Sequence, residues 1–225
     1  MTNELNKRIT TSVILFIILL VILYSHSSFF GISLLIFGFA ICIEFKNILR
    51  KLVGGLYLPS TKFNLKFFVL MWIPFIYMFF IFGLLTFDIY KTGGPTFFLF
   101  IISICFFTDI GGYIIGKTIG GKKLIKISPN KTLSGSVGSF IFSIIPLIIF
   151  TNINNFQLKF EISTVILCLL ISLISQIGDL FISLLKRKAK IKDTGNILPG
   201  HGGLLDRADG IIFAVPFSKL LLNFI

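Results

Sequence analysis

Residues 176–210 read QIGDLFISLLKRKAKIKDTGNILPGHGGLLDRADG, and the rest of the chain is organised around this stretch. It holds four of the nine acidic residues and six of the 21 basic ones, and long apolar segments flank it on both sides. The chain as a whole is 55% hydrophobic and only 13% charged. A local concentration of both signs of charge in such a chain indicates chemistry on a polyanion.

The composition is that of an integral membrane protein. Mean hydropathy is +0.98 and there are 28 phenylalanines, which is too apolar for a soluble domain. The net charge of +12 would also suit a nucleic-acid binder. In a membrane protein, however, excess Lys and Arg marks the loops that face anionic cytoplasmic lipid. We therefore expect the lipid bilayer as a partner, and no nucleic acid.

Segments of about 20 mostly apolar residues predict membrane-spanning helices. Seven segments fit, the first of them short: Ile9–Tyr24, Ser28–Phe45, Leu65–Phe87, Thr96–Ile115, Ser134–Thr151, Ser163–Leu185 and Ala208–Phe224. The predicted fold class is therefore all-α, a polytopic membrane protein with about seven transmembrane helices. Residues 1–95 would hold about three N-terminal spans, and residues 96–225 would form a catalytic transmembrane region with cytoplasmic loops. The first segment lacks a small-x-small cleavage site, which favours a retained helix.

The basic residues predict the orientation of these spans. With the N-terminus in the cytoplasm and seven alternating spans, 18 of the 21 basic residues fall on the cytoplasmic side. Only three fall on the outer side. Because such a split follows the positive-inside rule, the N-terminus is predicted to be cytoplasmic.

Several acidic residues lie near the predicted cytoplasmic side. Asp109 and Asp179 fall in the cytoplasmic halves of their spans, and Asp206 and Asp209 begin the last span on one helical face. A carboxylate inside a span is costly unless it is paired or lines a polar cavity, so it is a functional candidate. Glu44, at the end of the second span, is expected at the membrane interface.

Residues 111–118 match the phosphate-loop pattern G-x-x-x-x-G-K-[ST] literally. That motif requires a preceding buried strand and a following helix. Here the preceding residues, FFLFIISICFFTDI, are a predicted membrane helix. We therefore reject the phosphate-loop interpretation and expect residues 111–118 to continue that helix.

The segment after this helix offers a second set of polar groups. Ser128, Lys131, Thr132 and Gly135 supply hydroxyls, an ammonium and open backbone N–H groups at a predicted helix start. Helix N-termini and lysine both suit phosphate. The alternative is a turn that caps the fifth span, and the sequence leaves both interpretations open.

Carboxylates and cations of the opening stretch suggest a metal-assisted reaction. If the last two spans pack together, Asp206 and Asp209 would face Asp179. Two or three carboxylates indicate Mg²⁺, which binds oxygen ligands and is shared with substrate phosphates. The neighbouring cations are Lys186, Arg187 and Arg207. This set of groups is typical of phosphoryl or nucleotidyl transfer.

Simpler interpretations exist for some of these residues. Asp206 and Asp209 could cap the last helix, although a cap does not explain Asp179. His201 could act as a base or a phosphate donor, but it could equally fix a turn. Asp193 could simply pair with its neighbour Lys192.

The stretch closely resembles a known family signature. The pattern Ser183-x-Leu185-Lys186-Arg187, Lys192-Asp193-x-Gly195 and Leu198-Pro199-Gly200-His201-Gly202-Gly203-Leu204-x-Asp206-Arg207-x-Asp209 resembles that of the phosphatidate cytidylyltransferases, or CDP-diacylglycerol synthases. The resemblance extends upstream through Gln176-x-Gly178-Asp179, Ser128-Pro129-x-Lys131-Thr132 and Asp109-x-Gly111-Gly112-Tyr113. It covers roughly the C-terminal half of the chain.

The resemblance implies a reaction and its site. CTP and phosphatidate would give CDP-diacylglycerol and pyrophosphate in phospholipid biosynthesis, with Mg²⁺ as cofactor. In the family, the metal centre is built from the residues that match Asp179 and Asp206, and a second, monovalent cation can lie alongside Mg²⁺. We expect Asp209 to orient or ligate the metal. The segment of Ser128, Lys131 and Thr132 matches the nucleotide site.

The resemblance also bears on location and on rival functions. It implies a multi-pass protein of the bacterial inner membrane with its active site facing the cytoplasm, and it leaves a homodimer open. The alternative from another class is an ion-coupled transporter, in which Asp109 and Asp179 would bind cations at a broken helix. A CDP-alcohol phosphatidyltransferase is excluded because no acidic residue follows Asp209.

Overall fold

A computed structural model describes residues 2–53, 65–125, 128–153, 156, 158–198 and 202–222. The chain is mostly helical, as predicted. It forms two compact units, and each is discontinuous in sequence. The first unit is Met1–Phe87 with Leu185–Ala208, and the second unit is Asp88–Leu184 with Asp209–Ile225. The predicted division after residue 95 concerns function and stays a prediction.

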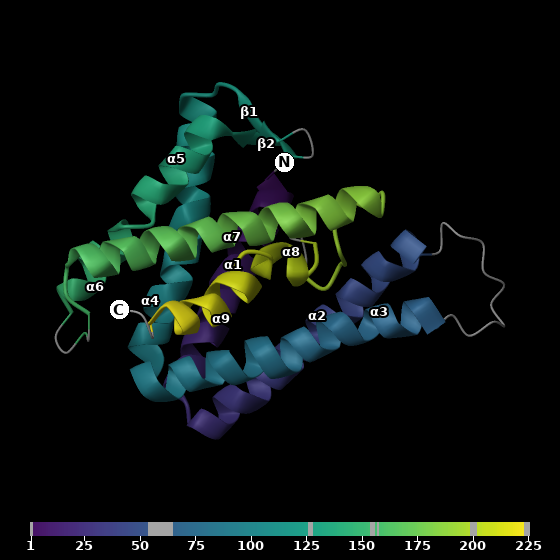
Figure 1. The fold of residues 1–225 in the computed structure, drawn as a ribbon, viewed down its shortest axis with the longest axis horizontal. Coiled ribbons are helices and arrows are strands. Elements are labelled where there is room, and N and C mark those ends of the chain that lie inside the picture. The colour runs from purple at the N-terminus through teal and green to yellow at the C-terminus, as the bar shows by residue number, and fades with distance from the viewer. Residues whose placement is uncertain are drawn as a thin grey trace. The chain divides into compact units, whose positions relative to one another are not determined.

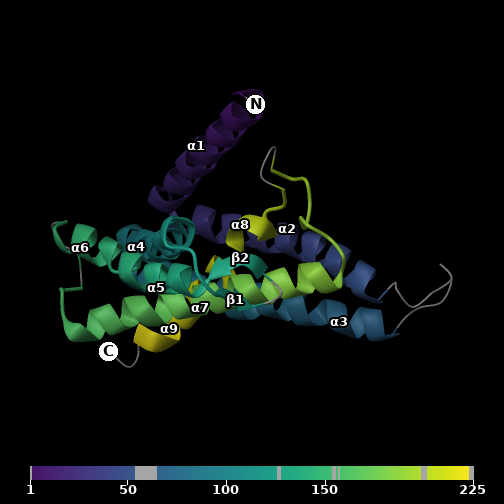
Figure 2. The same ribbon diagram turned by 90° about the horizontal axis from the view of Figure 1, so that it is seen from above.

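The first unit begins with helices α1 (Thr2–Tyr24) and α2 (Ser27–Val53), which a tight turn joins. Helix α3 (Leu65–Ile76) continues into the π-helical segment η1 (Tyr77–Phe82), and both lie beside α2 (Figures 1 and 2). Aromatic side chains fill this contact, with the rings of Phe37 and Phe82 5.8 Å apart.

Helix α4 (Gly83–Thr118) begins in the first unit and continues into the second. Gly94 interrupts it with non-helical angles, φ 74° and ψ 178°. A positive φ of this kind is readily adopted only by glycine, so Gly94 divides α4 into two helical parts. Without the break, the apolar segment Val69–Thr118 would be one helix of 50 residues. It would be about 75 Å long, more than twice the thickness of a bilayer core.

The second unit adds a hairpin and further helices (Figure 1). These elements are β1 (Lys123–Ile125), β2 (Ser128–Thr132), α5 (Leu133–Phe142), α6 (Ile145–Thr151), α7 (Ile162–Lys188) and α9 (Ile211–Leu222). Helix α7 ends in the first unit, which also holds the short helix α8 (Leu205–Ala208). Tight turns connect α5 to α6 and α8 to α9.

A short two-stranded hairpin, which the sequence did not predict, is added to the mostly helical fold. Strands β1 and β2 are antiparallel, and Lys123 lies opposite Thr132. Gly120 and Gly121, both with positive φ, end α4 and turn the chain. The polar sequence after this turn lacks the apolar periodicity of a helix, and pairing with β2 satisfies its backbone groups instead.

Among the described residues, four helical segments are long and apolar enough to cross a membrane: Ser27–Leu52, Val69–Thr118, Leu133–Thr151 and Ile162–Lys188. The segment Ile9–Tyr24 is apolar but shorter. Helix α9 has 12 residues, fewer than the predicted last span. The membrane character is therefore confirmed, whereas the count of seven spans stays a prediction.

Small residues bring α4 and α5 into close contact. A Cβ atom added to Gly111 would lie 2.5 Å from the Gly138 carbonyl oxygen, and one added to Gly112 would lie 2.7 Å from Ser139 Oγ. Small residues at such spacing allow membrane helices to approach closely. As predicted, residues 111–118 continue the helix. Their glycines serve helix packing, which explains the literal match to a phosphate loop.

Candidate functional site

The second unit contains a cavity of about 270 Å³ between α4, the hairpin, α5 and α7. Its lining residues are Asp109, Gly112, Tyr113, Leu124, Lys131, Thr132, Gly135, Ser136, Ser139, Gln176 and Asp179. Five of them were predicted as site residues: Asp109, Lys131, Thr132, Gly135 and Asp179. The fold thus brings together three predicted stretches that lie far apart in the sequence.

An ion pair joins the hairpin to α7 at this cavity. Lys131 Nζ pairs with Asp179 Oδ2, and Ser183 Oγ donates a hydrogen bond to Asp179 Oδ1 at 3.2 Å. The side chains of Lys131 and Asp179 are 31% and 24% exposed, so a ligand in the cavity can reach both. An ammonium suits phosphate, and a carboxylate is an oxygen ligand of the kind that Mg²⁺ prefers.

Local hydrogen bonds fix the hairpin at the start of α5. Thr132 is the N-cap residue, and its Oγ1 accepts a hydrogen bond from the Gly135 N–H at 3.0 Å. The Leu133 N–H donates to the Lys122 carbonyl at 3.0 Å. The capping interpretation is therefore confirmed for Thr132. The cap also fixes the backbone next to Lys131, and phosphate binding by this segment stays a prediction.

A chain of polar side chains leads from the cavity into the helices. Ser136 Oγ donates to Gln176 Oε1 at 2.6 Å, and Gln176 Nε2 donates to Ser172 Oγ at 3.3 Å. Thr108 Oγ1 donates to Ser172 Oγ at 3.0 Å, and Ser139 Oγ donates to the Thr108 carbonyl at 2.8 Å. None of these residues was predicted from the sequence to belong to the site. An amide inside an apolar span is a signal that could have identified Gln176.

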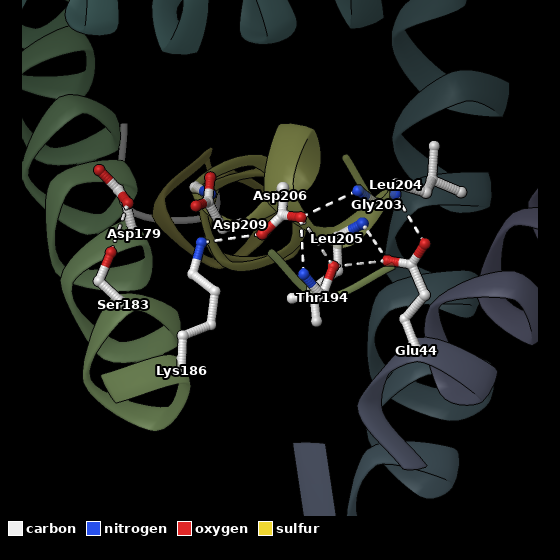
Figure 3. Close-up of polar contacts among 11 residues, drawn as sticks. Glu44, Asp179, Ser183, Lys186, Thr194, Gly203, Leu204, Leu205, Asp206 and Asp209 are labelled. Atoms are coloured by element: carbon white, nitrogen blue, oxygen red, sulfur yellow. Dashed lines mark hydrogen bonds and ion pairs between the residues drawn. The ribbon is translucent and has the colours of Figure 1, made fainter. Parts of the chain in front are cut away.

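In the first unit, Asp206 is held by a network of donors (Figure 3). Lys186 Nζ pairs with its Oδ1 at 2.9 Å, and its Oδ2 accepts from the Thr194 N–H at 2.8 Å and the Gly203 N–H at 2.9 Å. Burial opposes ionisation of Asp206, but Lys186 and the two N–H groups outweigh it and hold the pKa below its usual value. Asp206 is therefore an anion that organises its own loop.

Glu44 is a functional candidate that the sequence analysis missed. It was expected at the membrane interface, but α2 continues beyond it and the residue is only 1% exposed. Its carboxylate accepts hydrogen bonds of 2.8 Å from the Thr194 hydroxyl and from the N–H groups of Leu204 and Leu205 (Figure 3). These contacts could not be expected from the sequence because the donors come from a loop about 150 residues later in the chain. The signal available was a lone acid in an apolar run.

The other predicted residues have separate positions. Arg187 and Arg207 are exposed in the first unit, and Ser128 begins strand β2 in the second unit. The backbone of Asp209 lies against α7, since a Cβ atom on Gly178 would be 2.9 Å from its carbonyl oxygen. The remaining predicted residue, His201, lies outside the described residues.

Comparisons with known proteins agree with the signature. A sequence model described as the cytidylyltransferase family matches residues 7–225. The chain is 40% identical over 130 residues to a phosphatidate cytidylyltransferase of Bacillus subtilis (strain 168), covering 57% of this chain and 48% of the relative. A protein of the same name from Staphylococcus saprophyticus is 43% identical over 136 residues, covering 59% and 51%. The chain thus spans about half the length of the curated relatives it matches.

Proposed function

Because this chain belongs to the cytidylyltransferase family, we propose that it transfers a cytidylyl group from CTP to phosphatidate. The products are CDP-diacylglycerol and pyrophosphate. The names of its curated relatives support this assignment, and the family match does not support the alternative of an ion-coupled transporter. The observation that carries the proposal is the cavity lined by Lys131 and Asp179 at the start of α5.

The reaction needs no nucleophilic side chain. A phosphate monoester is already largely ionised near neutral pH, so an oxygen of phosphatidate attacks the α-phosphorus of CTP. The new P–O bond forms as the bond to the β-phosphate bridging oxygen breaks, and pyrophosphate leaves with the electron pair. The protein therefore contributes by positioning the reactants and by stabilising negative charge.

Cations of the segments that match the family signature would stabilise this charge. Lys131 is at the cavity, where its ammonium can contact the phosphates of CTP. The proposal assigns the same role to Lys186, Arg187 and Arg207 of the first unit. Ser128, Thr132 and Gly135 would bind the nucleotide around α5, and Asp109 would contact substrate from α4.

We propose Mg²⁺ as the cofactor, with Asp179 as the residue that fits it best. Among the described residues, no group of three or more His, Cys, Asp and Glu could hold a metal alone. Mg²⁺ is usually bound by one or two carboxylates together with substrate phosphates, and Asp179 lines a cavity large enough for phosphates. When bound, Mg²⁺ would neutralise charge on the triphosphate. The assignments of Asp206 and Asp209 as further ligands, and of a monovalent cation, stay proposals.

The hydrogen bonds and the ion pair of Asp206 would have to change before this residue could bind a metal ion. Its Oδ2 already accepts hydrogen bonds from Thr194 and Gly203, and its Oδ1 pairs with Lys186. Lys186 would have to release Oδ1 before that oxygen could bind a cation, as Lys131 would have to release Asp179 Oδ2. The released ammonium would then be available to a phosphate.

The proposal includes the membrane arrangement. Seven spans with a cytoplasmic N-terminus would place the site on the cytoplasmic side of a bacterial inner membrane, where CTP is found. The predicted placement of 18 basic residues on the cytoplasmic side and three on the outer side supports this orientation. Labelling single cysteines introduced at Lys122 and Lys159 in intact cells tests it. We expect only the second position to react with an impermeant reagent, and the reverse result would contradict the orientation.

Pyrophosphate release tests the activity directly. Purified protein in detergent is given CTP and phosphatidate with and without Mg²⁺, and the Asp179→Asn variant is compared with Asp88→Asn. Asp88 is a matched control because it is an ion-paired carboxylate of the same unit, bound to Lys219, that does not line the cavity. We expect at least a hundredfold loss for Asp179→Asn and little loss for the control. Absence of wild-type activity, or full activity of Asp179→Asn, would refute the proposal.

A further inference from the structure

We propose that Glu44 is a positioning residue, which holds the loop between α7 and α8 so that Asp206 keeps its orientation. The inference rests on the proposed function for its catalytic meaning, but its structural part does not depend on that function. Glu44 belongs to α2, far upstream of the C-terminal half in which the family signature is recognised.

A single carboxylate fixes both ends of the loop. Glu44 Oε2 accepts from the Thr194 hydroxyl and the Leu205 N–H, and Oε1 accepts from the Leu204 N–H, each at 2.8 Å. Thr194 follows the end of α7, whereas Leu204 and Leu205 lie where α8 begins. Figure 3 shows all three donors beside Glu44. A buried carboxylate needs such donors, and the three bonds satisfy it. Both ends of the loop are therefore hydrogen-bonded to α2.

Thr194 connects Glu44 to Asp206. Its hydroxyl lies 2.8 Å from Glu44 Oε2 and 3.1 Å from Asp206 Oδ2, while its N–H donates to the same Asp206 oxygen. The two carboxylates are thus bridged through one residue. A change at Glu44 is expected to alter the Asp206 contacts although the two residues do not bond directly.

Two glycines of the family-like signature are explained by this contact. A Cβ atom on Gly195 would lie 2.8 Å from Glu44 Oε1, and one on Gly203 would lie 2.5 Å from Glu44 Oε2. Any larger residue would displace the carboxylate. The backbone at Gly195 and Gly203 therefore leaves room for the Glu44 carboxylate only because both residues lack a side chain. This fit indicates that Glu44 has a specific role and is not an incidental buried acid.

Hydrogen exchange tests the structural part. In Glu44→Gln, one carboxylate oxygen becomes an NH₂ group that cannot accept from a backbone N–H. We expect the amides of Thr194 and Gly203, which donate to Asp206 and not to Glu44, to exchange about tenfold faster or more. Thr194→Val removes only the hydroxyl that bridges the two carboxylates, and we expect it to accelerate exchange of the Gly203 amide. Thr194→Ser keeps a hydroxyl, and we expect it to preserve the protection of that amide.

Thr86→Val is the matched control for a buried polar change in the same unit, because Thr86 Oγ1 has no hydrogen-bond partner among the described residues. We expect it to leave the exchange of the loop unchanged. If Glu44→Gln accelerates exchange only at the amides of Leu204 and Leu205, the proposal is overturned, because Glu44 would then stabilise only the two N–H groups that donate to it. Equal protection in Thr194→Val and Thr194→Ser would also overturn it.

Kinetics test the catalytic part. For Glu44→Gln, measured well below its unfolding temperature, we expect kcat for pyrophosphate release to fall about tenfold or more while KM for CTP changes less than threefold. A merely structural loss would lower the folded fraction and leave the kcat of folded enzyme unchanged, and that result would overturn the positioning role. If wild-type protein releases no pyrophosphate, the proposed function fails, and the exchange experiment still decides whether Glu44 orients Asp206.

Discussion

The close contact between α4 and α5 leads to a prediction of opposite effects for two glycine substitutions. In Gly111→Ala, the new Cβ would lie 2.5 Å from the Gly138 carbonyl oxygen and 2.6 Å from Phe142 Cβ. In Gly38→Ala on α2, the nearest atoms would be 3.8 Å away, which is ordinary contact. Both changes gain about 0.5–1 kcal/mol of helix propensity. Only the first also overpacks an interface, at a cost of about 1–3 kcal/mol.

The expected net effects follow from this difference. Gly111→Ala should destabilise the protein by about 0.5–2 kcal/mol, which lowers Tm by several degrees for a chain of this size. Gly38→Ala should leave Tm unchanged or raise it slightly. Thermal unfolding of both purified variants in the same detergent measures the difference. If Gly111→Ala is as stable as Gly38→Ala, the helices are not packed on their glycines and the reasoning is refuted.

Two further predictions concern the polar contacts. Gln176→Leu removes the partner of Ser136 and one donor to Ser172, so we expect a loss of about 1–2 kcal/mol in unfolding free energy; an unchanged Tm in detergent would contradict the polar chain. The second concerns pH, because the pKa of Asp206 is held below its usual value. Its contribution to stability is present above the ordinary pKa, about 4, and is lost as pH falls through the lower folded value. Exchange protection of the Gly203 amide, corrected for the intrinsic rate, should therefore hold from neutral pH to about 5 and weaken below about 4. Protection that instead weakens as pH rises from 5 to 7 would contradict this sign.

The apolar composition and the positions of the basic residues along the chain were sufficient to predict a helical membrane protein. A chain this hydrophobic cannot present a polar surface to water, and long apolar runs satisfy their backbone groups only as helices in lipid. The sequence also identified the acid and the lysine that meet at the cavity. Asp179 was a candidate because a carboxylate inside a span is costly, and Lys131 because a lysine at a helix start suits phosphate. The spacing of residues in the signature supported the family, which the comparisons confirmed.

The tertiary structure alone decided which of these groups touch one another. Lys131 reaches Asp179 only because a hairpin, which the apolar pattern did not predict, returns to α5 and is fixed there by the Thr132 cap. Glu44 is buried and hydrogen-bonded because its three donors, which belong to a distant loop, are packed against it. Hydrophobic periodicity reports which face of a helix is apolar, but a hydrogen bond between residues 150 positions apart depends on how the helices pack. The sequence by itself therefore determined the class of protein and its chemical groups, whereas the packing of the helices determined their partners.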